Sequence, residues 1–474
     1  MKSNPIPFMN RFIPAVRTAL AASVLLAAGT SALQAQAQSN PNEIAALRAL
    51  IQELDQKIKI LERKQENNDA TAATAATTTA RVTLNDRGLT VASPDAANSI
   101  RVRGLVQLDH RAFFSDGPNG LVNNAFILRR ARLISEGVFA KNYNFQLVTE
   151  FGGSAPAILD ANIGVILTPK VQIKAGRLKS PVGLELLQSD SWTFFNERSL
   201  VTNLVPNRDL GVLATGDVLD GRLNYTAGVF GGLSDAASTN NADFDNEKSF
   251  AGRLYATPFR NEGGSSLQGL SFGVSSSVGR EKTASGRTAG YRTDGQQTFF
   301  SYAATTVADG RNWRVSPQGE YRVGSFGLLG EYVVSAVNVR AGATGPKTEL
   351  RNKAWQLGAG YVLTGENSAY AGVVPKTNFD LAAGTWGAFE VVGRYATLNV
   401  DDAAFPTFAS VSTNADTAKS IGVGLNWYLS KAVRATFDYY QTKFDFNAAA
   451  PAVSSTPLLR QNEKSLITRL QLTF

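Results

Sequence analysis

Alternation of apolar and polar residues, repeated from about residue 100 to the C-terminus, is the feature that most restricts what this chain can fold into. Segments of roughly nine to sixteen residues follow this pattern, and Gly, Asn, Asp and Ser gather in the turns between them. In the last segment, Leu470, Leu472 and Phe474 share one face, whereas Arg469 and Gln471 share the other. Because successive side chains of a strand point to opposite faces, the pattern predicts an all-β fold of antiparallel strands.

The same stretch has the composition of a barrel that crosses a membrane with strands. Beyond the N-terminal region, no run of about 18 apolar residues is present, so the sequence excludes a helical span. The 42 Gly, 26 Phe, 13 Tyr and 5 Trp supply turns and the aromatic side chains that suit pleated surfaces and membrane interfaces. Water-soluble sandwiches seldom continue such a pattern in one domain of this length. We therefore expect a transmembrane β-barrel over residues 100–474. Its terminal Phe resembles the signal that the barrel-assembly machinery reads.

The number of strands follows from the even counts of single-chain bacterial barrels. A first segmentation finds seventeen strands. Short turns face the periplasm, so the tight turn at residues 324–325 requires residues 313–322 to run toward the periplasm. Residues 267–279 already run in the opposite direction, toward the outside of the cell. The aromatic segment 298–302 then belongs to one long outer loop. Sixteen strands remain, with both ends of the chain periplasmic, although the connection 365–383 is long for that side.

Residues 1–37 have the pattern of a cleavable secretory signal. A basic start is followed by an apolar stretch at residues 18–29 that is too short to span a bilayer, and residues 35–37 (Ala-Gln-Ala) form a cleavage site. Removal of the three basic residues of this segment leaves 44 basic against 39 acidic residues, a net charge of +5. For a chain of this length, a surplus of five positive charges is too small to indicate nucleic-acid binding.

A heptad pattern predicts a short coiled-coil helix over residues 38–68. Asn40 suits the cap, Pro41 suits the first helical position, and Glu43 completes a spacing like that of a capping box. The seam, at alternating spacings of three and four, consists of Ile44, Leu47, Ile51, Leu54, Ile58 and Leu61. Trimeric, dimeric and single-helix forms stay open. Residues 69–99 are expected to hold a low-complexity linker (69–80), followed by either a plug or a periplasmic strand.

Catalysis has little support in the composition. Cysteine is absent, and His110 is the single histidine, with a strand parity that points it toward lipid. A Ser and His hydrolase needs an imidazole beside its nucleophile, and no catalytic pairing of carboxylates is evident. We expect no enzyme activity, no cofactor and no metal site. An alternative function is a structural tether, in which the coiled coil reaches toward the cell wall and the barrel only anchors it.

Residues 176–216 (GRLKSPVGLELLQSDSWTFFNERSLVTNLVPNRDLGVLATG) resemble the fifth strand, the inward-folded constriction loop and the next strand of the phosphate-selective porin O and P family. Similar stretches lie at residues 129–137 (RRARLISEG), 316–335 (SPQGEYRVGSFGLLGEYVVS), 384–399 (GTWGAFEVVGRYATLN) and 424–440 (GLNWYLSKAVRATFDYY). The resemblance implies a homotrimer of sixteen-stranded barrels in the outer membrane of a Gram-negative bacterium. It also implies basic channels that pass phosphate, polyphosphate or other small anions, in contact with membrane lipid and lipopolysaccharide.

The pore walls must replace the hydration that an anion loses in a low-dielectric barrier. Several weak sites built from Arg and Lys meet this need, because Arg can bind two oxygens with its planar fork and Lys acts as a point charge. Strand parity identifies the lumen side: if Ala131 and Leu133 face lipid, Arg130 and Arg132 face the lumen about 7 Å apart.

The candidate pore-lining residues are Arg101, Arg103, Arg111, Arg130, Arg132, Lys174, Arg177, Lys179, Arg198 and Arg208. The first five lie on the first two strands, the next three on the strand that enters the constriction loop, and the last two in and after that loop. An alternative interpretation makes some of them structural ion pairs. The candidate pairs are Asp109 with Arg130, Glu197 with Arg198, and Asp209 with Arg208. The resemblance also implies that strong phosphate selectivity needs several lysines converging on one narrow point, which one sequence does not show. The second candidate function is a weakly selective channel for carboxylates or general small solutes.

Overall fold

The computed structural model describes residues 41–114, 124–239, 242–243, 245–283, 290–447 and 462–474. The chain divides into two units, Met1–Thr78 and Thr79–Phe474. The expected signal segment and the tip of the first outer hairpin, residues 117–121, lie outside the described residues.

The described part of the first unit is one helix, α2 (Pro41–Thr78). Its start agrees with Pro41 at the first helical position and Glu43 in the first turn, where a negative charge suits the helix dipole. The helix continues through residues 69–78, for which the sequence predicts a linker. Alanine, the strongest helix former, is abundant in this stretch and accounts for the difference.

Among the described residues, no helix combines the length and apolarity needed to cross a membrane.

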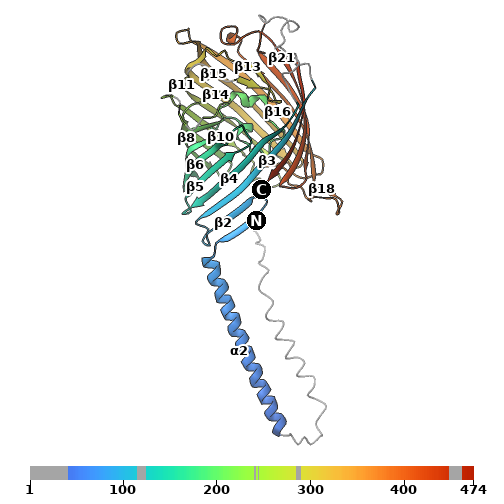
Figure 1. Cartoon of the computed structure of the whole chain (residues 1–474). Helices are drawn as coiled ribbons and strands as arrows, with labels where there is room; N and C mark the ends of the chain where they lie inside the picture. Colours follow the sequence, from blue (N-terminus) through green and yellow to red (C-terminus); the bar gives the residue numbers. More distant parts are fainter. Residues whose placement is uncertain (1–40, 115–123, 240–241, 244, 284–289, 448–461) are drawn as a thin grey trace. The chain divides into compact units, whose positions relative to one another are not determined.

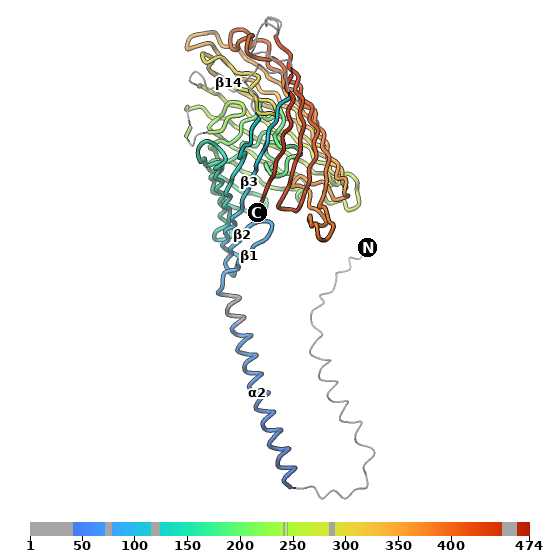
Figure 2. The backbone as a smooth tube through the Cα atoms, turned by 45° about the vertical axis from the view of Figure 1, so that its right-hand side comes forward, coloured from blue at the N-terminus to red at the C-terminus, as the bar shows by residue number. Residues whose placement is uncertain are grey.

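The second unit is a closed antiparallel barrel of sixteen strands, as predicted. Each of these sixteen strands pairs with the next one along the chain, and the last pairs with the first, through Gln471 opposite Gln107, so that the wall is closed. Figures 1 and 2 show the first and last strands side by side. The strands are β3 (Ser99–Phe113), β4 (Ala125–Phe139), β5 (Tyr143–Glu150), β6 (Ala157–Thr168), β7 (Val171–Lys179), β8 (Arg208–Val218), β9 (Leu223–Phe230), β10 (Ser249–Ala256), β11 (Leu270–Lys282), β14 (Thr306–Val323), β15 (Phe326–Ala341), β16 (Thr348–Val362), β19 (Ala388–Asn399), β20 (Thr417–Tyr428), β21 (Val433–Asp445) and β22 (Asn462–Thr473).

The ambiguous segment before the barrel is a hairpin rather than a plug. Strand β1 (Arg81–Asn85) pairs with β2 (Gly88–Ala92), and β2 pairs with the start of β3. Gly88 has a φ of 96°, which a glycine adopts at little cost where this hairpin turns.

The long and short connections lie where the strand count places them. The outer loop between β11 and β14 contains the small hairpin of β12 (Gly290–Arg292) and β13 (Thr298–Ser301), so the aromatic segment 298–302 is not a wall strand. On the opposite side, β14 and β15 are joined by the tight turn 324–325. The long connection between β16 and β19 carries a second hairpin, formed by β17 (Phe379–Asp380) and β18 (Thr385–Trp386).

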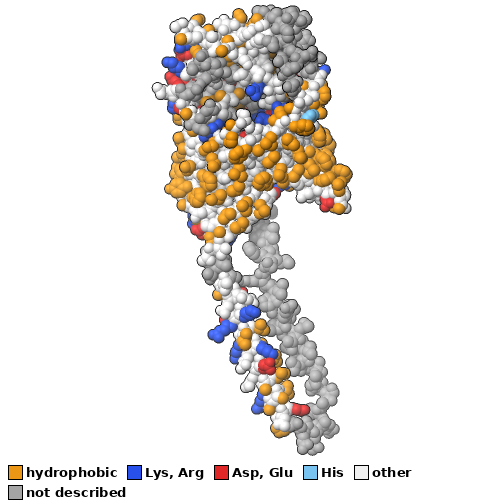
Figure 3. Space-filling model, viewed as in Figure 1, with side chains coloured by type: hydrophobic (Ala, Val, Ile, Leu, Met, Phe, Trp, Pro, Cys, Tyr) orange, Lys and Arg blue, Asp and Glu red, His pale blue; other side chains and the backbone are white. Residues whose placement is uncertain are grey.

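The two faces of the wall have the chemistry that the alternation predicts. On β22, Leu470 is 54% exposed, whereas Arg469 and Gln471 are buried in the lumen. Phe126 and Leu108 are likewise exposed on the outer wall. Figure 3 shows that hydrophobic side chains form a broad band across the face of the barrel in view. This band matches the hydrocarbon layer of a membrane.

The outward orientation of Val423, which is 53% exposed on β20, gives a test of this wall. We expect Val423→Arg to lower the free energy of unfolding in lipid vesicles by about 2 to 4 kcal/mol, because it puts a charge into hydrocarbon. Denaturant titration followed by tryptophan fluorescence measures the change. The control is Thr215→Arg, whose side chain enters a lumen cavity. Equal losses in the two variants would contradict the assignment of the faces.

Candidate functional site

The connection between β7 and β8, residues 180–207, folds into the barrel and is called the constriction loop. It contains a short helix, α3 (Leu184–Leu187), and a 3-10 turn, η1 (Leu200–Leu204). Val182, Leu184, Leu200 and Leu204 are at most 1% exposed. Val182, Leu200 and Leu204 pack in one apolar cluster with wall side chains such as Leu213 and Val333, so the loop is a packed element of the lumen.

A glutamate of the wall fixes the start of the loop. Glu331 on β15 accepts hydrogen bonds from the backbone N–H groups of Leu184 (2.8 Å) and Glu185 (3.2 Å) at the N-terminus of α3. Glu185 in turn pairs with Arg394 on β19 (3.2 Å) and accepts a hydrogen bond from Gln356. Charged hydrogen bonds in a site shielded from water hold this end of the loop in one position.

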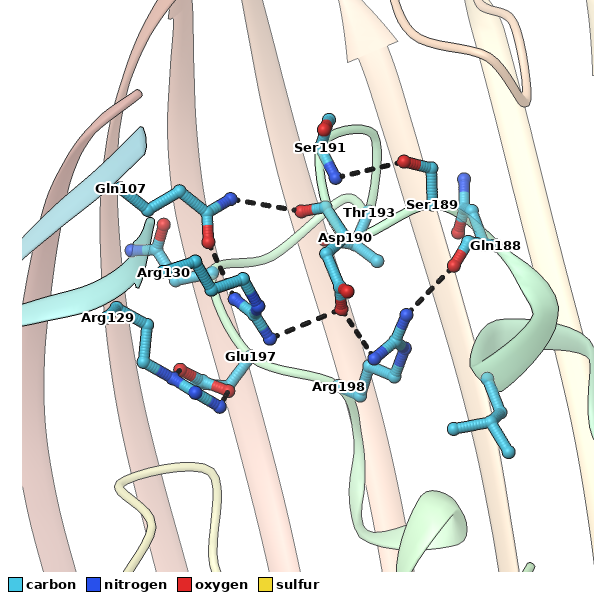
Figure 4. A network of polar contacts seen from close by, with 12 residues as sticks. Gln107, Arg129, Arg130, Gln188, Ser189, Asp190, Ser191, Thr193, Glu197 and Arg198 are labelled. Carbon is cyan, nitrogen blue, oxygen red and sulfur yellow. Dashed lines mark hydrogen bonds and ion pairs between the residues drawn. The ribbon is translucent and has the colours of Figure 1, made fainter. Parts of the chain in front are cut away.

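Two acidic side chains fix the rest of the loop. Asp190 pairs with Arg130 (3.2 Å), with Arg198 (2.6 Å) and with Arg132. Figure 4 shows its carboxylate between Arg130 and Arg198.

Glu197 has a similar set of three arginine partners from the wall. Its carboxylate lies 2.6 Å from Arg129, 2.9 Å from Arg111 and 3.1 Å from Arg469. Six arginines thus meet these two loop carboxylates and the wall carboxylates Asp109 and Glu150, so six positive charges face four negative ones in this part of the lumen.

The arginines keep both carboxylates ionised. Burial alone would raise the pKa of Asp190, but the charges of Arg130, Arg198 and Arg132 outweigh it and hold that pKa well below its ordinary range. Burial is likewise outweighed at Glu197, chiefly by Arg129, and its pKa also lies well below the ordinary value.

A β-bulge explains why Arg129, which lines the outer cavity, was missed by strand parity. Gln107 lies opposite Arg130, but Leu108 lies opposite Leu128, so Arg129 is an extra residue in β4. Both Arg129 and Arg130 therefore reach loop carboxylates, although neighbours in a regular strand point to opposite faces. A bulge leaves no clear signature in one sequence.

The three candidate ion pairs are not the ones that form. Asp109 pairs with Arg469 (2.6 Å) and Arg111 (3.3 Å), because the bulge places Ile127 rather than Arg130 opposite it. Adjacent side chains of an extended segment diverge, so residues next to each other in the chain take different partners. The observed pairs are Arg198 with Asp190 and Arg208 with Asp160, while Asp209 accepts backbone hydrogen bonds from Leu210 and Gly232.

Two cavities lie on either side of these ion pairs. The outer cavity, about 460 Å³, is lined by Arg129, Arg130, Arg198 and residues of the outer loops such as Arg292. The inner cavity, about 810 Å³, reaches the periplasmic turn residue Lys431.

The predicted residues divide between these places. Six of them line the inner cavity: Arg101, Arg103, Arg132, Lys174, Lys179 and Arg208. Arg130 and Arg198 line the outer cavity, and Arg111 is buried in the Glu197 cluster. Arg177 is buried within electrostatic reach of Asp160 and Arg208. Arg394 was not among the predicted pore-lining residues, although the alternation of side chains along β19 places it on the lumen face. It lies beside Glu185.

The long periplasmic connection, residues 363–387, contacts the constriction loop from the periplasmic side. Tyr370 donates a hydrogen bond to the carbonyl of Leu184 (3.0 Å) and accepts one from Gln188 at its own carbonyl (2.9 Å). Gly372 has a φ of 94°, and a Cβ there would lie 2.3 Å from the ring of Trp192, so the close approach requires glycine. This contact explains why the connection is longer than a periplasmic turn.

His110 lies away from all of these groups. It is opposite Phe126 on β4, with ring centroids 4.7 Å apart, and Phe126 is 78% exposed on the outer wall. Within the described ranges, no group of three His, Cys, Asp or Glu side chains is placed to hold a metal ion.

The ion pairs of the constriction loop predict a pH dependence of stability. A lowered folded pKa stabilises the protein above the unfolded carboxylate pKa of about 4, and this stabilisation is lost as the pH falls through the folded value. We expect the unfolding midpoint in detergent to be steady from pH 7 to about pH 4 and to decrease below that.

Removing one partner tests the same network at neutral pH. Asp190→Asn leaves Arg130, Arg132 and Arg198 without their shared carboxylate, so we expect a loss of about 3 to 5 kcal/mol and faster proteolysis of the loop. The control is Asp220→Asn in an exposed turn, which should have no effect. Identical behaviour of the two variants would show that Asp190 does not hold the loop.

The family model of the phosphate-selective porin O and P matches residues 100–474. Porin O of Pseudomonas aeruginosa is 26% identical over 410 residues, which cover 79% of this chain and 90% of that protein.

Two solved structures share the fold. The outer membrane channel DcaP of Acinetobacter baumannii has a TM-score of 0.51 at 11% identity, covering 80% of this chain and 98% of that one. Salmonella typhi OmpF, in a complex with daunomycin, has a TM-score of 0.50 at 13% identity, covering 83% and 100%. Because the family model spans most of the sequence, the chain belongs to the phosphate-selective porin O and P family, and it is an integral outer-membrane porin that forms an anion channel rather than an enzyme.

Proposed function

We propose that phosphate or related anions cross this channel through the inner cavity, attracted by its surplus of positive charge. The observation that carries the proposal is the lining of that cavity, where nine basic side chains face four carboxylates. The basic residues are Arg87, Arg101, Arg103, Arg132, Lys174, Lys179, Arg208, Arg253 and Lys431, and the acidic ones are Asp86, Glu136, Asp160 and Asp190.

Three of these cations form no ion pair with a carboxylate among the described residues. Lys174 forms no hydrogen bond or ion pair with any described residue. Lys179 donates only to backbone carbonyls, the closest being that of Leu186 at 2.6 Å. Arg253 donates to the amide oxygen of Gln318 (3.0 Å) and lies over the ring of Tyr255. Dispersed cations without a carboxylate partner suit conduction, because an anion must leave each site as readily as it enters.

The passage between the cavities runs along the Asp190 cluster. Arg130 and Arg198 line the outer cavity, and Arg132 lines the inner one. All three pair with Asp190, and Arg132 also pairs with Glu150 (2.7 Å), so three positive charges face two negative ones. An anion that passes here meets a net attraction, and its oxygens find guanidinium donors on both sides of the constriction.

A weakly selective channel for carboxylates or general small solutes is the second candidate. It is favoured by the pairing of the arginines around Asp190 and Glu197, which weakens their attraction for a free anion. In this case the lumen would prefer anions as a class but would not retain phosphate.

The assembly that we propose is a homotrimer of barrels in contact with membrane lipid and lipopolysaccharide. Insertion by the barrel-assembly machinery is proposed from the terminal Phe474 of the last strand.

Planar-bilayer recording tests the proposed function directly. In asymmetric potassium chloride we expect a reversal potential of the anion-selective sign, and added phosphate should reduce the chloride current by occupying the inner cavity. Anion selectivity without block by phosphate would favour the weakly selective channel. A cation-selective potential would contradict both, and a protein without conductance would favour the tether.

Lys174 provides a local test of the inner cavity. A charge about 5 Å from a passing anion changes its energy by roughly 1 to 3 kcal/mol, depending on the local dielectric constant. Lys174→Glu should therefore reduce the anion-to-cation permeability ratio several-fold in bilayers. The matched control is Lys170→Glu, in an exposed periplasmic turn outside the cavity lining. A ratio unchanged by Lys174→Glu would remove this residue from the conduction path.

A further inference from the structure

The helix α2 carries an apolar face that no described residue covers. The six seam residues from Ile44 to Leu61 are all exposed, among them Ile51 at 62% and Leu54 at 51%. Helices in proteins gain most of their stability by packing an apolar face. An exposed stripe of this kind therefore indicates a binding surface.

The charges that border the stripe fit a second copy of the same chain. With Ile44, Ile51 and Ile58 at position a and Leu47, Leu54 and Leu61 at position d, each g position of a parallel, in-register coil faces the e position five residues later in the neighbouring helix. All charged pairs of this kind are opposite in sign. Glu43 faces Arg48 of the partner subunit, and Lys57 faces Glu62 of the partner subunit. Lys64 faces Asp69 of the partner subunit.

Chain connectivity favours the parallel arrangement. Only Thr79 and Ala80 separate α2 from β1, so the C-terminal end of every α2 starts from the same end of its barrel. An antiparallel pair would separate these two ends by most of the helix length, about 1.5 Å per residue. Copies that enter one membrane in one orientation cannot span that separation with two residues.

The width of the stripe favours three helices over two. Ile at a with Leu at d favours two strands when these core positions are considered alone. However, Leu50 at a g position and Ile60 at a c position widen the apolar face on one flank, and both are more than half exposed. Each helix of a three-stranded coil contacts two neighbours, so it covers such a flank more fully than a two-stranded coil does. We propose that the α2 helices of three copies of this chain form a parallel, in-register coiled coil; the number three agrees with the proposed barrel trimer.

The absence of native cysteine makes disulfide crosslinking of the full-length mature protein a clean test. Leu47→Cys and Leu61→Cys, examined separately, should each give covalent dimers on oxidation, because identical residues of a parallel coil meet at the seam. Gln65→Cys, at the next a position, should do the same without removing an apolar side chain. The control is Gln56→Cys at an outward f position, which should remain monomeric on denaturing gels.

The patterns of crosslinking distinguish the alternatives. The double variant Leu47→Cys with Leu61→Cys should give covalent trimers, and dimers alone would overturn the three-stranded coil. Crosslinks that form only between a Leu47→Cys chain and a Leu61→Cys chain would overturn the parallel arrangement. Crosslinking of Gln56→Cys as strong as that of the seam variants, or none at any seam position, would overturn the coil altogether.

The channel function is measured independently on the same samples. Oxidised and reduced Leu61→Cys protein should show the same anion selectivity in bilayers, because no seam residue lines either lumen cavity. Loss of crosslinking with normal selectivity would refute the coil alone. Normal crosslinking without anion selectivity would refute the proposed function alone.

Discussion

The pairing of buried loop carboxylates with wall arginines is the interaction on which the lumen depends. A loop folded into a water-filled barrel exposes backbone groups and charges on all sides, and it stays in place only if the wall supplies partners. Glu185, Asp190 and Glu197 find these partners on several different strands. Because each pair is held away from bulk water, losing one partner leaves an uncompensated buried charge, which is far more costly than losing a surface ion pair.

The same arginines serve both structure and conduction. The wall provides more positive charge than the loop neutralises, and the surplus appears in the cavities on both sides of the Asp190 cluster. An anion channel needs this combination, because fully neutralised arginines would not attract anions and unpaired ones would leave the loop without anchors. The periplasmic connection adds an uncharged support, through Tyr370 and through the contact of Gly372 with Trp192.

The barrel was predictable because its pattern is local. A period of two places Leu470 outside and Arg469 inside without any knowledge of distant residues. The even strand count and the difference between short and long connections then placed residues 298–302 in a loop. The inward orientation of Arg132 and Lys174 follows from the same period. The helix, by contrast, extends past its expected end, because alanine-rich sequence of low complexity is compatible with both a linker and a helix.

By itself, the sequence determined the alternating strands, the side of the wall on which each regular strand residue lies, and the excess of basic residues at the lumen. Only the tertiary structure decided which acid meets which base. Asp109 takes Arg469, 360 residues away, rather than Arg130. The physical reason is that barrel closure and one bulge bring these groups together. Both depend on the register of strands far apart in the chain, whereas a repeating pattern of side chains acts within each strand.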